Sequence, residues 1–129
     1  MKLLHVALAA IGMSLCGLSA LAAEPLQGTW TGTGYVKPSK GERESVRCKV
    51  SYNPEGSSVV AVSATCASSS ITLHQTGELS MVGPGRYVGD FYNAEYDVSG
   101  RIQVSVSGSS QTVTLSGPRG GGSLSLSKR

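Results

Sequence analysis

From residue 28 onward the chain alternates apolar and polar residues in short runs, which are separated by Gly, Pro, Ser and Asn. Val46, Cys48, Val50 and Tyr52 show the pattern clearly, and residues 60–66 repeat it. A period of two is typical of strands with one buried and one wet face, and no run after residue 22 fits a helix. The pattern predicts strands near positions 28–36, 46–52, 60–66, 71–75, 78–82, 86–91, 102–106, 113–115 and 124–126.

The connections between these runs are short, so consecutive strands should pair as an antiparallel meander. We interpret Thr76 and Gly77 as one of its tight turns. The expected fold class is all-β: a small antiparallel up-and-down barrel of about 8–9 strands, with a two-layer β-sandwich as the alternative. In the barrel, the last strand around Leu124 and Leu126 pairs with the first.

Two cysteines follow the first 22 residues, Cys48 and Cys66. Residues 53–57 carry a dense turn signal, and a hairpin folded about them places Cys48 opposite Cys66 and Val50 opposite Ala64. One register aligns both the apolar face and the two sulfur atoms, which predicts a disulfide; two buried free thiols are the alternative. Closing this loop stabilises the fold by about 3 kcal/mol, mainly by restricting the unfolded chain.

The first 22 residues have the composition of a secretory leader. Lys2 is followed by an apolar run over residues 3–18, and the small residues Ala20 and Ala22 precede the expected cleavage point. We expect a signal peptide at 1–22 and a single β domain at 23–129, in a secreted or periplasmic protein. A membrane anchor and a lipoprotein acylated at Cys16 are the alternatives.

Charge narrows the classes of partner. Loss of Lys2 with the leader leaves 10 basic and 8 acidic residues, a net charge of 10 − 8 = +2. This balance is too mild to indicate nucleic-acid binding, and the sequence shows no basic stripe with interleaved aromatic residues. We expect no nucleic-acid partner, no membrane span after cleavage, and a monomer.

Aromatic and acidic residues concentrate between positions 87 and 97. Aromatic rings with a polar group are favoured at binding surfaces, so this segment is the candidate contact for an unknown protein partner. The alternative is ordinary core packing, because Tyr87 and Phe91 occupy alternate positions of a strand. The candidate partner-binding residues are Tyr87, Phe91, Tyr92, Glu95 and Tyr96.

A second candidate site lies in the first strand, where Gly32 and Gly34 share a face with Trp30. Glycines leave a gap in a strand surface, which could receive a small ligand beside the indole ring. The alternative is that a neighbouring large side chain fills the gap, as is common in a small packed barrel.

The sequence offers no catalytic constellation. His74 is the one histidine after the leader, which is insufficient for a zinc site, and there is no G-x-S-x-G motif to pair it with a serine. The acids at 90–97 do not have the spacing of a calcium loop. We therefore expect a protein that is not an enzyme and has no metal or cofactor, with a hydrolase built on His74 as a minor alternative.

The tripeptide Gly28-Thr29-Trp30 resembles the G-x-W opening of lipocalin-like and avidin-like barrels, and one disulfide in a glycine-rich barrel resembles small periplasmic protease inhibitors. The order G-x-W-x-G-x-G, then Cys48, then Cys66 is similar to small exported proteins of alphaproteobacteria. These resemblances imply a bacterial envelope or secreted origin. The leader, the disulfide and the lack of a catalytic constellation favour an exported, non-enzymatic binding protein of the envelope, an inhibitor, or a secreted virulence factor or effector. A small-ligand carrier with a lipocalin-like cavity is the alternative.

Overall fold

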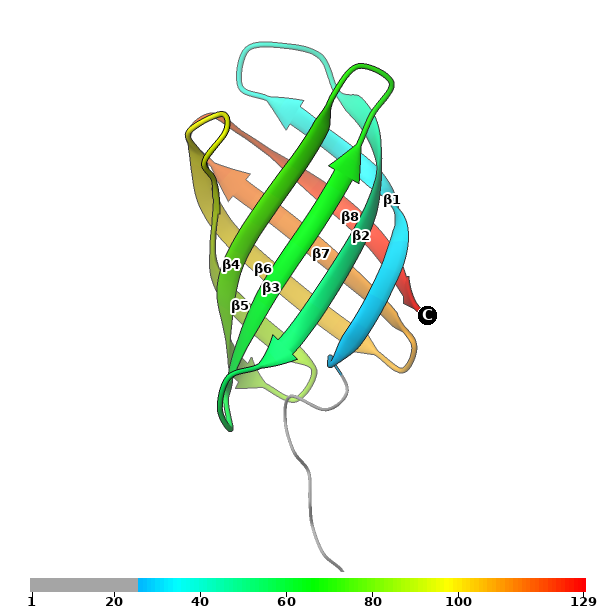
Figure 1. Cartoon of the computed structure of the whole chain (residues 1–129), viewed down its shortest axis with the longest axis vertical. Helices are drawn as coiled ribbons and strands as arrows, with labels where there is room; N and C mark the ends of the chain where they lie inside the picture. Colours follow the sequence, from blue (N-terminus) through cyan, green and yellow to red (C-terminus); the bar gives the residue numbers. More distant parts are fainter. Residues whose placement is uncertain (1–25) are drawn as a thin grey trace, which may run out of the picture.

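The computed structural model describes residues 26–129, which form eight antiparallel strands closed into a barrel (Figure 1). Strands form here because the side chains alternate between a buried inner face and a polar outer face. The strands are β1 (Gly28–Pro38), β2 (Glu44–Pro54), β3 (Val59–Ala67), β4 (Thr72–Gly83), β5 (Arg86–Asn93), β6 (Val98–Ser107), β7 (Ser110–Gly117) and β8 (Gly120–Lys128).

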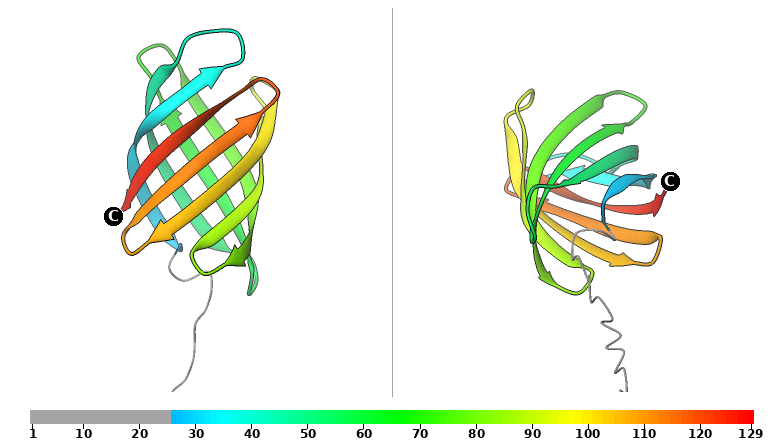
Figure 2. Two further views of the ribbon diagram at one scale, coloured as in Figure 1. Left: turned by 180° about the vertical axis from the view of Figure 1, so that it is seen from behind. Right: turned by 60° about the horizontal axis from the view of Figure 1, so that its bottom comes forward.

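Each strand pairs with its neighbours in sequence, and β8 closes the barrel by pairing with β1. The predicted barrel is therefore confirmed over the sandwich, as is its closure, in which Leu124 and Leu126 lie opposite Gly34 and Gly32. The strands tilt steeply around the barrel, with hairpin turns at both ends (Figures 1 and 2). No helix within residues 26–129 is long and apolar enough to cross a membrane.

One end of the barrel, which we call the Trp30 end, is closed by large side chains. Trp30 and Leu26 are fully buried, and the indole Nε1 donates a hydrogen bond of 3.0 Å to the Leu26 carbonyl. The Lys128 ammonium lies 5.8 Å from the centre of the Trp30 ring, within the range of a cation–π contact. Tyr52 and Tyr87 are buried in the same half of the barrel.

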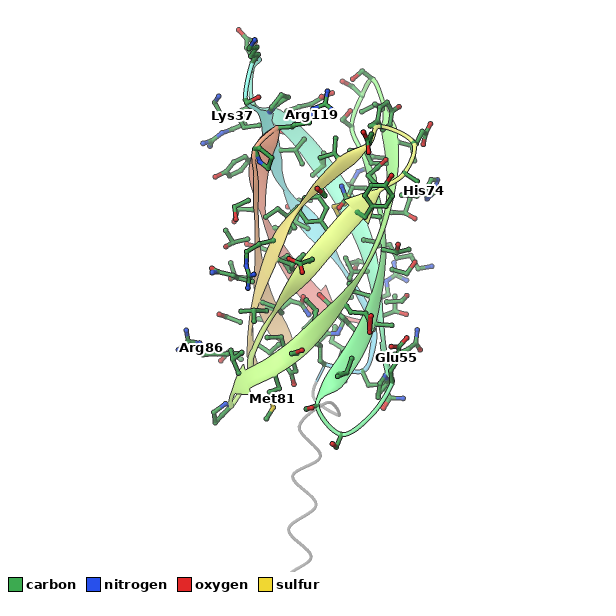
Figure 3. The ribbon with its side chains drawn as sticks, turned by 90° about the vertical axis from the view of Figure 1, so that its left-hand side faces the viewer. Lys37, Glu55, His74, Met81, Arg86 and Arg119 are labelled. Atoms are coloured by element: carbon green, nitrogen blue, oxygen red, sulfur yellow. A yellow bond between two sulfur atoms is a disulfide. The ribbon has the colours of Figure 1, made fainter. Side chains whose placement is uncertain are left out.

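The opposite end, which we call the Arg119 end, is less completely filled. It carries the turns at 39–43, 68–71, 94–97 and 118–119, and Lys37 and Arg119 lie together there (Figure 3). Inward-facing Val36, Leu73 and Leu115 are only half-buried. The interior is therefore sealed at one end and partly exposed at the other.

The predicted hairpin around the cysteines is confirmed. Cys48 lies opposite Cys66 and Val50 opposite Ala64, and the two sulfur atoms form a disulfide inside the barrel. The sequence separation of 18 residues gives a loop whose closure stabilises the fold by about 3 kcal/mol.

The predicted turn at Thr76 and Gly77 is wrong, because both residues lie within the continuous strand β4. Gly77 faces Phe91 of β5, and a Cβ on Gly77 would collide with the carbonyl oxygen of Asp90. The glycine is required by the close approach of two strands and does not mark a chain reversal. Merging the two short runs gives eight strands.

Candidate functional site

The aromatic–acidic segment divides between the interior and the surface. Tyr87 is 1% exposed and Phe91 is 6% exposed, so both belong to the core and are withdrawn from the candidate contact surface. Tyr92 is 49% exposed and Tyr96 41%, and Glu95 is also exposed. The division follows from strand alternation, because Tyr87 and Phe91 point inward from β5 while Tyr92 points outward.

Residues 92–97, which comprise the end of β5 and the turn to β6, are held by three side-chain hydrogen bonds; we call this segment the tyrosine hairpin. The Tyr96 amide donates to Asn93 Oδ1 at 3.0 Å, and the Tyr92 hydroxyl donates to Asp97 Oδ1 at 3.3 Å. Arg119, from the turn between β7 and β8, donates to the Asp97 carbonyl at 3.2 Å. Two exposed rings are thus presented by a constrained loop, which reduces the entropy lost on binding.

Backbone and side-chain features of the same turn also cost free energy. Asp97 has φ of 51°, a left-handed conformation that is unfavourable for a residue with a side chain. Asn93 is 1% exposed, and its Nδ2 has no hydrogen-bond partner among residues 26–129. Such features cluster at functional sites, because stability alone disfavours them.

Next to the tyrosine hairpin, the outer wall of β3, β4 and β5 is hollowed into a groove of about 760 Å³, which we call the acidic groove. Small residues such as Ala61, Ser63 and Gly77 line it, together with Tyr92. Three carboxylates line it, and no Lys or Arg does: Glu55, Glu78 and Asp90.

Two of these carboxylates are directly opposed. Glu78 on β4 and Asp90 on β5 are cross-strand partners on the outer face, an arrangement that is destabilising for like charges. Arg101 lies 3.9 Å from Asp90 and relieves part of this repulsion, but both side chains are largely exposed, so the ion pair is weak. The negative charge of the groove is therefore only partly neutralised, and a cationic ligand would be attracted to it.

The predicted ligand gap beside Trp30 is absent. A Cβ on Gly32 would collide with the carbonyl oxygen of Ser125, and one on Gly34 with that of Ser123, both from β8. The glycines thus allow β1 and β8 to approach closely, and the space beside them is occupied by backbone. Trp30 itself closes one end of the barrel.

The interior holds a small apolar cavity elsewhere, of about 30 Å³. Val62, Ala64, Cys66 and Phe91 are among its lining residues, together with the polar Gln75. This volume is far below the roughly 300–1,000 Å³ of typical small-molecule sites.

His74 lies exposed on the outer wall of β4 (Figure 3). Its Nδ1 is 3.1 Å from Thr65 Oγ1, and the described part of the chain contains no group of three or more His, Cys, Asp or Glu residues that could hold a metal. His74 is thus a surface residue that is hydrogen-bonded across two strands.

Comparison with known proteins shows the fold alone. No protein-family model and no curated protein matches the chain. A de novo designed fluorescence-activating β-barrel has a TM-score of 0.65 at 18% identity, over 84% of this chain and 98% of that chain. A redesigned β-barrel bound to DFHBI has a TM-score of 0.70 at 13% identity, over 84% and 100%. Rv2717c from M. tuberculosis has a TM-score of 0.59 at 13% identity, over 85% and 98%.

The sequence reasoning missed the acidic groove, since Glu55, Glu78 and Asp90 are far apart in the chain. The hairpin register brings Glu78 and Asp90 together. Their alternation with inward Leu79 and Phe91 is the signal that could have revealed it, once strands β4 and β5 were aligned correctly.

Proposed function

We propose that the protein is a non-enzymatic binding module that holds a basic segment of a partner protein in the acidic groove, with Tyr92 and Tyr96 as aromatic contacts. Export from the cytoplasm remains part of this proposal; residues 1–22 lie outside the described structure, and the buried disulfide is compatible with an oxidising compartment. Either an envelope protein or a host protein could supply the basic segment.

The observation that carries the proposal is the opposition of Glu78 and Asp90 next to an exposed tyrosine on the same face of β5. A Lys or Arg side chain entering the groove would relieve the like-charge repulsion and could stack on the Tyr92 ring. The small lining residues leave room for such a long side chain. Binding energy is thus provided by a feature that the free fold does not need.

A peptide of alternating Lys and Ala residues serves as a probe, and one of alternating Glu and Ala as its control. We expect only the lysine peptide to shift the amide resonances of residues 76–78 and 90–92 in NMR titrations. Glu78→Gln and Tyr92→Ala should weaken this binding, whereas Glu42→Gln, in the turn between β1 and β2, should not. Equal weakening by Glu42→Gln would show a general charge effect and refute the groove.

A second function, that of a small-ligand carrier, is favoured by one observation. Asn93 leaves its buried Nδ2 without a partner among residues 26–129, and Gln75 lies near it, one residue beyond the paired Thr76 and Tyr92. Gln75 lines the apolar cavity, and together with the neighbouring Asn93 it could orient a carbonyl or carboxylate group of a ligand. The redesigned barrel that resembles this chain binds DFHBI, which supports the capacity of such a fold to hold a small molecule. The 30 Å³ cavity must enlarge first, for instance by rotation of Phe91.

DFHBI itself is a suitable probe for the carrier function. If the interior opens to ligands, fluorescence of DFHBI should increase with protein concentration, and Ala64→Leu, which fills the cavity, should abolish the increase. Ala67→Leu places the same side chain on the outer face of β3 and should leave it unchanged. If the wild-type protein causes no increase in DFHBI fluorescence, the interior does not open to this ligand, and the carrier function is contradicted.

A further inference from the structure

A second charged surface lies on the outer wall of β1, β2 and β3. Two shallow grooves of about 650 and 540 Å³ meet there and share Thr33, Arg47 and Ala67. We call the combined surface the basic trough. Four cations line it, and no Asp or Glu side chain does: Arg43, Arg47, Lys49 and Arg129.

The cations of the trough are available to a ligand. Arg47 and Lys49 are exposed and point outward from β2, about 7 Å apart along the strand. Among residues 26–129 neither of them forms an ion pair, since the one ion pair of that range joins Arg101 to Asp90. Both are flanked by short side chains, Thr33 and Ala67 beside Arg47, and Thr31 and Thr65 beside Lys49, so neither charge is covered by a neighbour.

Arg43 is oriented before any ligand arrives. Its guanidinium carbon lies 3.7 Å from the centre of the Tyr35 ring, a close cation–π contact that leaves the N–H groups at the rim free to donate. The adjacent Glu44 is engaged elsewhere, because it accepts a hydrogen bond of 2.5 Å from Ser70. Hydrogen bonds from Ser68 and Ser70 lower the pKa of the Glu44 carboxyl.

We propose that the basic trough binds a linear anionic polysaccharide, one that carries carboxylate or sulfate groups. The trough is elongated, concave and positively charged, and between its cations it is lined by hydroxyl groups, among them Thr31, Thr33, Ser45 and Thr65. Hydroxyl-bearing side chains match the many hydroxyl groups of a sugar chain, while the spaced cations match its repeated charges.

Other polyanions fit this surface less well. A single-stranded nucleic acid needs free aromatic faces for its bases, and the one ring of the trough, Tyr35, is already covered by Arg43. A membrane surface calls for exposed apolar side chains, and the large ones within residues 26–129 lie elsewhere, at Val82, Tyr92 and Tyr96.

Binding of heparin, measured by isothermal titration calorimetry, tests the proposal. We expect heparin to bind at about 0.05 M salt and to be released by about 0.5 M salt, because exposed charges are screened. The double variant Arg47→Gln, Lys49→Gln should weaken binding on the order of tenfold. Arg86→Gln combined with Arg101→Gln removes two charges outside the trough and should have little effect. Equal losses in the two double variants would overturn the proposal.

Two further comparisons make the outcome specific. Tighter binding of an oligo-dT strand or of phosphatidylglycerol vesicles than of heparin would overturn the assignment to polysaccharides, and neutral dextran should not bind. Glu78→Gln should leave heparin affinity unchanged, which separates this site from the acidic groove. All the substituted side chains are exposed, so thermal unfolding should confirm that each variant folds.

Discussion

Replacing Gly32 by Ala tests how the barrel is closed. The added Cβ would lie 2.8 Å from the Cα of Leu126 and closer still to the carbonyl oxygen of Ser125. Ordinary carbon–carbon contacts are about 3.5–4.0 Å, so β1 and β8 must separate by roughly 1 Å. Overpacking typically costs about 1–3 kcal/mol, and a clash with backbone places this change at the upper end, out of a total stability of about 5–15 kcal/mol. We therefore expect a loss of about 3 kcal/mol and a Tm lower by about 10–20 °C.

Guanidinium unfolding, followed by the fluorescence of the single Trp30, measures this loss. Gly56→Ala is the matched control, because no atom lies within 4 Å of its added Cβ and its stability should change by less than about 1 kcal/mol. If Gly32→Ala unfolds at the same guanidinium concentration as the wild type, the strands have room at this position. The hypothesis of a ligand gap beside Trp30 would then be supported again.

Three other properties follow from the interior and the groove. Burial raises the pKa values of Tyr52 and Tyr87 above those in the unfolded chain, so the stability they contribute is present below about pH 10 and is lost as the pH rises further. The free energy of urea unfolding, measured between pH 8 and 12, should show this decline, and Tyr52→Phe should make it shallower. The same pH dependence in the variant and the wild type would contradict the assignment of the decline to Tyr52. Replacing both Cys48 and Cys66 by Ala should cost at least about 3 kcal/mol in the same assay, whereas an unchanged midpoint would show that the disulfide contributes little. Glu78→Gln should stabilise the barrel by about 0.2–1 kcal/mol while weakening the lysine peptide, and a destabilised variant would show that the opposed carboxylates are not in conflict.

The barrel could be predicted from the sequence because inner and outer residues alternate so regularly. The register of Cys48 against Cys66 follows from one turn and one apolar face, and it is correct. The glycines are harder to interpret. The sequence pattern predicts a turn at Gly77 and a gap at Gly32, whereas both glycines allow two backbones to approach closely. Only the three-dimensional path of a neighbouring strand distinguishes these roles.

The candidate surfaces were less predictable than the fold. Alternation within β5 could suggest that Tyr92 faces outward, but not that its hydroxyl would bind Asp97 or that Arg119 would hold the same turn. These contacts join turns that are distant in sequence. The basic trough was overlooked for a similar reason, since Arg129 is far from Arg47 and Lys49 in sequence and joins them only when β8 closes on β1.

A net charge of +3 for the whole chain conceals an uneven distribution of charge around the barrel. Five of the eight acids follow Pro54 and precede β6, whereas the basic trough is built on β1 and β2 with Arg129 at its edge. Between residues 102 and 127 the chain carries one charge, Arg119. Exposed ion pairs contribute little to stability, and the barrel is already specified by its apolar interior and its inward glycines. Folding therefore does not require this distribution, and the opposition of Glu78 and Asp90 even works against it. The distribution instead matches the two proposed binding surfaces, the acidic groove and the basic trough, which adjoin along the outer side of β3.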